Sequence, residues 1–313
     1  MLSIGSSPHI RDKETVKSIM WWVVVSLLPA GVAGVWLFGL RALYIMIVCV
    51  VSAVITEFLI QKFLLKRKIT ISDGSAVVTG LLLAYNVSVG LPLWMAALGS
   101  VFAIAIGKMV FGGLGRNIFN PALIGRAFLV ASFPAAMTRF YEPFQKALVS
   151  TATPLAVIKE GGVATVSYRD LFLGIRGGCI GETSVLALLI GAGILLWRRY
   201  ISLRIPLAYI TTVAVLTWIF SGKALFTGDW LFHILSGGLI LGAFFMATDM
   251  VTSPITKKGQ IIFGIGCGII TSVIRIWGGY PEGVSYSILM MNGLVPLIDA
   301  YIRPRRLGEG SKK

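Results

Sequence analysis

Residues 42–65 read ALYIMIVCVVSAVITEFLIQKFLL, and this stretch decides the fold. Only Glu57 and Lys62 are charged within it. A transmembrane helix needs about 20 consecutive, predominantly apolar residues, whereas a buried helix of a soluble protein usually has a shorter apolar run. The stretch therefore predicts a helix that crosses a membrane.

The rest of the chain has the same character. Its 313 residues are 56% hydrophobic and 13% charged, and the mean hydropathy is +0.86. A soluble domain carries roughly a quarter charged residues. The composition therefore excludes an ordinary soluble domain and predicts an all-α polytopic membrane protein.

Ten apolar segments are candidates for membrane spans. They are residues 18–39, 42–65, 75–91, 93–111, 118–133, 183–198, 203–220, 230–248, 259–277 and 281–302. Glycine, proline, asparagine and serine interrupt the third, the fifth and the last. Interrupted spans occur where neighbouring protein or a cavity satisfies the freed backbone groups, so we expect a binding site within the bundle.

The distribution of lysine and arginine predicts the orientation. These residues gather in alternate connecting segments, for example at 62–68, 198–204 and 303–313. Segments rich in lysine and arginine face the cytoplasm. We therefore expect both termini in the cytoplasm and the long polar segment 133–182 on the opposite side. Topology also explains the net charge of +15, so nucleic acid is not an expected partner.

The sequence contains a weak internal repeat. Residues 80–86 (GLLLAYN) resemble residues 242–248 (GAFFMAT) in spacing and character. Two halves of five spans each have opposite orientations, which is the inverted-repeat plan of many transporters. We expect about ten transmembrane helices in two inverted five-helix repeats. The repeats are residues 1–132 and 183–313, and the loop 133–182 joins them.

Metal-ligating residues are scarce. Cys49, Cys179 and Cys267 lie far apart with no CxxC spacing, and His9 and His233 are the only histidines. An iron–sulfur cluster, a zinc site or a bis-histidine haem held by this chain is therefore not expected. We assign no catalytic residue and no metal ligand.

Four charged residues lie within or at the ends of apolar spans. Burying a charge at the centre of a bilayer costs about 2.5–3.5 kcal/mol on insertion scales. For Glu57, Asp249 and Arg275 the simpler interpretation is a position near enough to the interface to reach water. Arg126 has helix on both sides, and it is the better candidate for binding an anionic ligand.

Tyr280 and Glu282 follow the glycine pair Gly278-Gly279 on the expected outer side. An aromatic ring and a carboxylate there suit contact with the ring of a cofactor. Anchoring at the membrane interface is the alternative for the tyrosine, and helix packing is the alternative for the glycines.

Residues 148–155 (LVSTATPL) interrupt the apolar pattern with three hydroxyl groups in four residues. Pro154 ends the run, so the segment predicts a short loop that presents side-chain oxygens near a membrane boundary. Taken alone, the segment is equally compatible with an ordinary serine/threonine turn.

Several motifs together carry a resemblance to a known family. They are residues 79–82 (TGLL), 112–122 (GGLGRNIFNPA), 125–129 (GRAFL), 245–249 (FMATD) and 279–284 (GYPEGV). The combination resembles the D-subunit family of the Rnf electron-transport complexes, which is related to the B subunit of the sodium-translocating NADH:quinone oxidoreductase. The resemblance extends from about Lys66 to Asp299. The short N-terminal segment favours the Rnf branch.

The resemblance implies a covalent flavin. The family carries FMN, esterified through its phosphate to a threonine in a Ser-Gly-Ala-Thr motif. Residues 150–153 match this motif, so Thr153 is the implied attachment point and Ser150 is part of the site. Thr151 replaces the usual glycine, which changes the backbone preference and adds a competing hydroxyl. The resemblance also implies a noncovalent riboflavin within the bundle, with no contacts that the sequence identifies.

The implied function is electron transfer in an ion-translocating ferredoxin:NAD⁺ oxidoreductase. The chain is then one subunit of this membrane enzyme, with no complete active site of its own, in a bacterial or archaeal cytoplasmic (inner) membrane. Implied partners are the flavin-bearing G subunit, the A and E membrane subunits, the soluble B and C subunits, and membrane lipid. The coupling ion is Na⁺ or H⁺, and Glu57, Asp73 and Asp249 are candidate cation ligands.

Two other functions fit the span pattern. A small-solute transporter or channel with the same inverted-repeat fold explains the interrupted helices equally well. A structural scaffold for partner subunits is the third interpretation. A bound chromophore distinguishes the first function from both alternatives.

Overall fold

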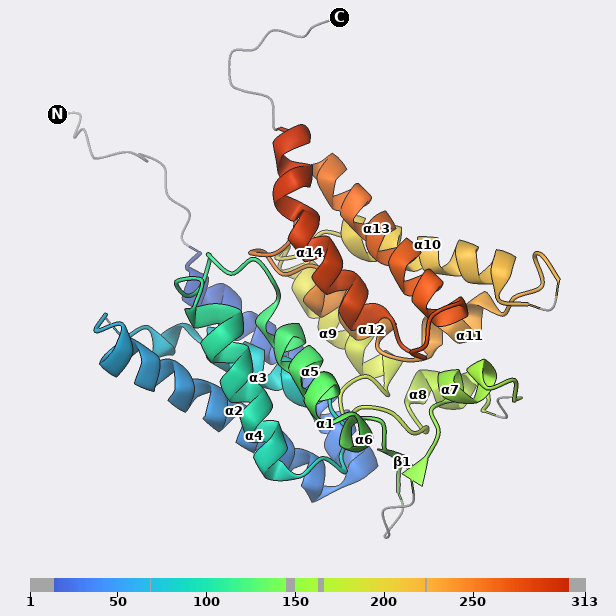
Figure 1. Cartoon of the computed structure of the whole chain (residues 1–313), viewed down its shortest axis with the longest axis horizontal. Helices are drawn as coiled ribbons and strands as arrows, with labels where there is room; N and C mark the ends of the chain where they lie inside the picture. The colour runs from blue at the N-terminus through green and yellow to red at the C-terminus, as the bar shows by residue number, and fades with distance from the viewer. Residues whose placement is uncertain (1–13, 68, 145–149, 163–165, 223, 304–313) are drawn as a thin grey trace, which may run out of the picture.

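The computed structural model describes residues 14–67, 69–144, 150–162, 166–222 and 224–303 (Figure 1). This part of the chain is predominantly helical. The main helices of the first half are α1 (Val16–Phe38), α2 (Leu40–Leu59), α3 (Ser75–Tyr85), α4 (Leu93–Ile104) and α5 (Pro121–Ser132). Those of the second half are α9 (Val185–Trp197), α10 (Arg204–Phe220), α13 (Lys257–Ile276) and α14 (Val284–Tyr301).

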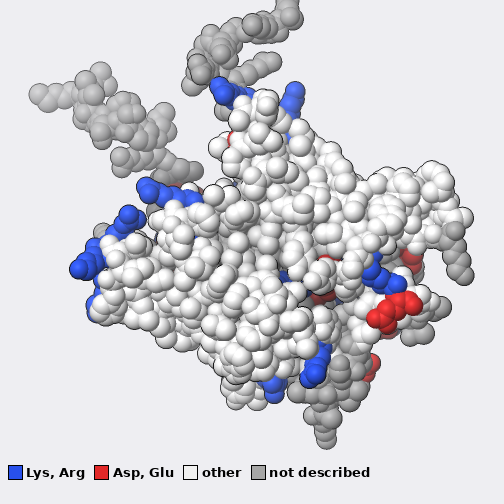
Figure 2. All heavy atoms as spheres, viewed as in Figure 1, with Lys and Arg blue, Asp and Glu red and all other residues white. Residues whose placement is uncertain are grey.

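Within the described residues, three helical stretches are long and apolar enough to cross a membrane. They are Val16–Phe38 with 23 residues, Leu40–Leu64 with 25 and Lys257–Ile276 with 20. At about 1.5 Å per residue, each reaches the roughly 30 Å thickness of a bilayer core. Large apolar side chains such as Val32 and Trp36 are exposed on their outer faces. Figure 2 shows a broad uncharged surface with most lysines and arginines towards its edges. The prediction of a helical membrane protein is confirmed.

The third predicted span is not a continuous helix. Helix α3 has 11 residues and ends at Asn86, so its length of roughly 16 Å covers about half of a bilayer core. The main-chain N–H groups of Gly181 and Ile180 donate to the carbonyls of Tyr85 and Val87, at 3.1 and 3.0 Å. These bonds satisfy carbonyl groups that the end of the helix leaves free.

The eighth predicted span is also broken, which the sequence interpretation did not expect. It consists of α11 (Trp230–Leu235), α12 (Leu239–Leu241) and the π-helical turn η4 (Gly242–Met246). The break occurs at Gly237, whose φ of 67° lies in the left-handed region that glycine adopts readily. The two broken spans are the two segments that resemble each other in sequence.

Two further π-helical turns extend long helices. Turn η1 (Ile60–Leu64) continues α2, and turn η3 (Ala105–Met109) continues α4. The 3₁₀ turn η2 (Ile71–Asp73) precedes α3. Single π-helical turns such as η1 and η3 occur frequently at functional sites. Lys108 lies within η3.

The helices pack in two groups. In the first group, α2 packs against α3 and α4, and α4 packs against α5. In the second group, α10 packs against α11 and α13, and α13 packs against α14. The groups meet where α1 contacts α9 and where α5 contacts α14.

The segment between the groups forms a small cap. It contains α6 (Pro134–Met137), the antiparallel strands β1 (Phe140–Tyr141) and β2 (Ser150–Thr151), α7 (Pro154–Lys159) and α8 (Tyr168–Leu173). Figure 1 shows these elements at the end of the molecule opposite to the start of α1 and the end of α14. Leu155 and Leu171 pack with Phe232 of α11, which fixes the cap to the second group.

Candidate functional site

Thr153 occupies a defined position in the cap. It is the N-cap of α7, and its Oγ1 accepts a hydrogen bond from the main-chain N–H of Ala156 at 3.3 Å. Pro154 follows at the first helical position, where its missing N–H is not needed. Residues 150–155 therefore contain strand β2, the N-cap residue of α7 and the first two residues of that helix. Thr153 is only 5% exposed.

The other two hydroxyl residues of the motif lie in strand β2. The main chains of Ser150 and Thr151 pair with Tyr141 and Phe140. A β-branched residue suits extended backbone, so threonine at position 151 is compatible with the fold that this segment adopts. The side chains of Ser150 and Thr151 lie outside the described structure, as do residues 145–149.

Lys159 holds the other end of α7 against the second group of helices. Its ammonium donates to the carbonyl oxygens of Ile274 and Tyr280, at 3.1 and 2.6 Å. Partial burial lowers the pKa of this lysine. On the same side of the molecule, the hydroxyl of Tyr168 donates to Asp229 at 2.6 Å, and this bond raises the pKa of the phenol.

Arg126 of α5 joins both groups of helices. Its guanidinium donates to Asn86 Oδ1 at 2.8 Å and to Ser285 Oγ at 3.0 Å. It also forms an ion pair with Glu282 at 2.6 Å. The structure thus brings together two of the residues predicted from sequence, Arg126 and Glu282, and gives the arginine a carboxylate partner within the chain.

The main chain of Tyr280 lies close to this site. Its carbonyl binds Lys159, whereas its ring is half exposed and lies 5.5 Å from the ring of Tyr286. A contact between this ring and a cofactor stays a prediction.

Two more arginines and a glutamate lie beside the Arg126–Glu282 pair. Arg275 of α13 donates to the carbonyls of His233 and Ser236, and Arg176 donates to those of Glu182 and Gly237. The interpretation that Arg275 reaches water was wrong, because the residue is 4% exposed. The turn after α11 covers the end of α13, where Arg275 lies. The sequence pattern predicted a continuous span through this turn.

The sequence analysis did not identify Arg176 and Glu182. Both lie in the long segment 133–182, where polar residues were attributed to an aqueous loop. The end of that segment instead folds into the bundle against α3, so Arg176 is 5% exposed and Glu182 is 1% exposed. The short run Gly178–Gly181 allows this close approach, and a Cβ at Gly181 would clash with the ring of Tyr85.

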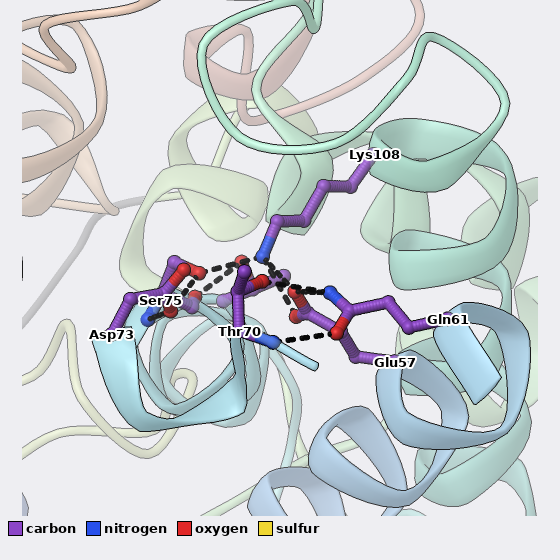
Figure 3. A network of polar contacts seen from close by, with 7 residues as sticks. Glu57, Gln61, Thr70, Asp73, Ser75 and Lys108 are labelled. Atoms are coloured by element: carbon purple, nitrogen blue, oxygen red, sulfur yellow. Dashed lines mark hydrogen bonds and ion pairs between the residues drawn. The ribbon is translucent and has the colours of Figure 1, made fainter. Parts of the chain in front are cut away.

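A second polar cluster lies near the other end of the bundle (Figure 3). Glu57 of α2 and Lys108 of η3 form an ion pair with an N–O distance of 2.7 Å. The ammonium of Lys108 also donates to Ser75 Oγ at 2.6 Å. Gln61 donates from its amide to Glu57 at 2.9 Å. The interpretation that Glu57 reaches water was wrong, because a neighbouring helix supplies a counter-charge and the side chain is 1% exposed.

Asp73 is a second candidate cation ligand in this cluster. Its Oδ1 accepts hydrogen bonds from both the main-chain N–H and the hydroxyl of Ser75, at 2.8 and 2.5 Å. Asp249 is partly buried and lines the same cavity as Ser75 and Lys108, and it accepts hydrogen bonds from the Val251 N–H and from the Thr252 hydroxyl. These carboxylates are thus held by neighbouring groups of the chain.

The two short helices meet near the centre. The amide nitrogen of Asn86 lies 3.6 Å from the sulfur of Met246, at the ends of α3 and η4. Asn120 caps the start of α5 and reaches the carbonyl of Met246 at 3.5 Å. A cavity of about 80 Å³ lies nearby, and Asn117, Asn120 and Asp249 contribute to its lining.

Comparison with known proteins identifies the family. The model of the NQR2, RnfD, RnfE family matches residues 3–308. The chain belongs to this family. Membership of the family that the sequence motifs indicated is therefore confirmed, and the match extends beyond the region from Lys66 to Asp299 that carried the resemblance.

Curated relatives agree over nearly the full length. The chain is 53% identical over 312 residues to the D subunit of the Na⁺-translocating ferredoxin:NAD⁺ oxidoreductase complex of Acetobacterium woodii, covering 98% of this chain and 95% of the relative. It is 49% identical over 320 residues to the D subunit of the proton-translocating ferredoxin:NAD⁺ oxidoreductase complex of Clostridium ljungdahlii, covering 98% and 96%. It is 39% identical over 333 residues to the D subunit of the ion-translocating oxidoreductase complex of Stutzerimonas stutzeri, covering 96% and 94%.

Proposed function

We propose that this chain is the membrane electron-transfer subunit of an ion-translocating ferredoxin:NAD⁺ oxidoreductase of the Rnf type. The names of relatives at 49% and 53% identity over nearly the whole chain carry this proposal. The chain then acts as one subunit of an oxidoreductase and translocase. We place it in a bacterial or archaeal cytoplasmic membrane.

FMN esterified to Thr153 is the redox cofactor in this proposal. When bound, FMN accepts and donates electrons, and the protein positions it and tunes its potential. The residues present fit an ester at this position. Thr153 Oγ1 accepts its hydrogen bond from Ala156 and donates none to the described residues, so esterification removes no donor that the fold uses. Because Thr153 is only 5% exposed, the cap must open during the reaction that attaches the flavin.

The proposed topology has both termini in the cytoplasm and the cap on the outer side. The arrangement of the cap opposite the start of α1 and the end of α14 supports it (Figure 1). We also propose that residues 1–132 and 183–313 form two inverted repeats joined by the segment 133–182. The similar packing of the two helix groups and the pair of short helices support this division.

The remaining partners follow from the same proposal. Electrons pass to or from centres on the flavin-bearing G subunit, the A and E membrane subunits, or the soluble B and C subunits. One relative is named for Na⁺ and another for protons at similar identity, so family membership alone leaves both ions open. Glu57, Asp73 and Asp249 remain candidate cation ligands.

A noncovalent riboflavin within the bundle is a further part of the proposal. Among the described residues, the Oδ1 atom of Asn117 is buried without a hydrogen-bond partner, and Asn117 lines the cavity of about 80 Å³, which supports a polar ligand there. The cavity of about 80 Å³ is smaller than the roughly 300–1,000 Å³ of typical small-molecule sites. Binding of a flavin there requires side chains to move, so no contacts are assigned.

A small-solute transporter or channel is the second candidate function. The two short helices that meet at Asn86 and Met246 favour it, because discontinuous helices form the substrate sites of many transporters. This function predicts a chain without a covalent chromophore.

Flavin fluorescence distinguishes the two functions. The full-length chain is produced with and without a flavin transferase, denatured, and separated on a gel. We expect a fluorescent band in the matured wild type and its loss in Thr153→Ala, with Thr151→Ala as the matched control that keeps it. Mass spectrometry of the peptide spanning residues 148–155 locates the modification. Fluorescence that persists in Thr153→Ala and disappears in Thr151→Ala moves the ester to Thr151, and a matured wild type without flavin favours the transporter.

A further inference from the structure

Two buried guanidinium groups lie beneath the cap without a carboxylate partner. Arg176 is 5% exposed and Arg275 is 4% exposed. Among the described residues, neither forms an ion pair. A charge removed from water is costly unless an opposite charge and hydrogen bonds compensate it. Among the described residues, these two arginines therefore lack an anion at ion-pair distance.

The hydrogen bonds of the two arginines satisfy them only in part. Their terminal nitrogens bind main-chain carbonyls, with Arg176 at 3.2 Å from Glu182 O and Arg275 at 3.2 Å from Ser236 O. Carbonyl groups carry no net charge. In the part of the chain that the structure describes, the Nε atom of each arginine is buried without a hydrogen-bond partner, and so is the hydroxyl of Ser236. Three unused donors thus surround the turn after α11.

The local charge is positive. Arg126 is paired with Glu282, and the carboxylates of Glu182 and Glu282 both act on Arg176 and Arg275 without forming an ion pair with either among the described residues. One oxygen of Glu182 accepts a hydrogen bond from the N–H of Cys179 at 3.1 Å, and the other has no partner among the described residues. Three guanidinium groups against two carboxylates leave an excess of one positive charge (3 − 2 = 1).

This positive site adjoins the segment that carries Thr153. A Cβ added to Gly237 would lie 2.9 Å from Leu155 Cδ1 and 3.2 Å from Arg275 Nη2, so both side chains converge on one point. Arg176 reaches the carbonyl of the same glycine at 3.4 Å. Leu155 is two residues from Thr153, so the threonine lies at the start of the same short helix as the side chain that reaches this point.

We propose that Arg176 and Arg275 bind the phosphate of the flavin nucleotide esterified to Thr153. The inference rests on the proposed attachment and names the residues that hold the attached group. A phosphate bridging the ribityl chain and the threonine carries one negative charge, which matches the excess positive charge of the site. Guanidinium groups suit phosphate because their planar donors bind its oxygens in pairs. The ester and the two arginines together fix the start of the cofactor chain in the docked cap.

The experiment compares the full-length chain in lipid nanodiscs, matured with flavin transferase or left without it. Two quantities are measured: the gain in melting temperature on maturation, and the quenching of the attached flavin by iodide. Wild type is compared with Arg176→Gln, Arg275→Gln and the charge-conserving Arg275→Lys. Arg198→Gln, which removes a partly exposed arginine paired with Glu14, is the matched control.

We expect maturation to raise the melting temperature of wild type and of Arg198→Gln equally. The Gln variants of Arg176 and Arg275 lose half or more of this gain, and their flavin is quenched more strongly per molecule. Arg275→Lys retains most of the gain, and it keeps the test valid if a neutral variant does not fold. Equal gains and equal quenching in all folded variants would overturn the proposal.

Two further results distinguish this proposal from its alternatives. One is the absence of a flavin at Thr153, and the other is a lipid phosphate bound at the two arginines. A matured wild type without flavin at Thr153 contradicts the proposed function, whatever the arginines do. A lipid phosphate is the other source of the same chemistry. In Thr153→Ala, anionic phospholipid that raises the melting temperature only when Arg176 and Arg275 are both present assigns the site to lipid and overturns the assignment to the flavin.

Discussion

At the scale of single residues, Glu57 and Lys108 show how burial makes one charge depend on another. The side chains are 1% and 2% exposed, and the ammonium contacts both carboxylate oxygens and Ser75 Oγ. Neither charge can reach water when its partner is removed. Breaking a buried ion pair by removing one partner costs about 3–5 kcal/mol, because the remaining charge stays uncompensated.

We therefore expect Glu57→Gln to lower the free energy of unfolding by about 3–5 kcal/mol. The double variant Glu57→Gln/Lys108→Met removes both charges and recovers most of the loss. Chemical denaturation in detergent, followed by tryptophan fluorescence, measures the difference. Glu14→Gln, which removes the carboxylate of the exposed pair with Arg198, is the control and costs less than about 1 kcal/mol. A Glu57→Gln variant as stable as this control contradicts the prediction.

Residue-level prediction from sequence succeeded for Arg126 and failed for Glu57, Arg275 and Glu182. Helix on both sides of Arg126 indicated burial, and the structure shows 9% exposure. Glu57 and Arg275 lie nearer to span ends, so the sequence allowed water contact that the packing of other helices excludes. Glu182 belongs to a polar segment, and nothing local to it indicated that the segment folds into the bundle.

At the scale of elements, the position of α7 depends on a few contacts at its two ends. Thr153 caps its start, and Lys159 binds the carbonyls at the end of α13 and at Tyr280. A helix of six residues has little stability of its own, so these contacts and the packing of Leu155 hold it in place.

Lys159→Met is expected to loosen the cap without unfolding the bundle. The loss of a partly exposed charged donor is worth about 1 kcal/mol, which corresponds to a roughly fivefold larger population of the opened cap. Limited proteolysis should then cleave within residues 142–166 about threefold to tenfold faster. Lys62→Met is the control, since Lys62 contacts only the rings of Phe58 and Phe63 among the described interactions. Equal cleavage rates in both variants contradict the role of Lys159.

The elements that the sequence described least well are the two broken spans. Residues 86–91 and 236–242 are apolar or small, so a hydropathy pattern of about 20 residues continues through both breaks. The sequence similarity between 80–86 and 242–248 singled out the same two places. It did not show that these segments end in the bundle, because that depends on the donors of Gly181, Ile180 and Asn120.

At the scale of the whole molecule, the proposed topology places the cap and the Lys62 region on opposite sides of the membrane. Cys49, Cys179 and Cys267 are buried, so single introduced cysteines report position against a low background. We expect Tyr168→Cys to react with a membrane-impermeant maleimide in intact cells. Lys62→Cys should react only after the membrane is permeabilised. The reverse pattern places the cap in the cytoplasm and removes the basis for an external flavin.

The sequence by itself determined the membrane class, the family and the candidate threonine. These properties depend on composition and on short contiguous motifs, which need no knowledge of distant contacts. The tertiary structure decided which charges meet. Glu57 and Lys108 are 51 residues apart, and Arg126 and Glu282 are 156 apart. Such pairs arise from helix packing and from the breaks in two spans, and the low dielectric of the bundle makes each buried charge depend on the partner that packing supplies.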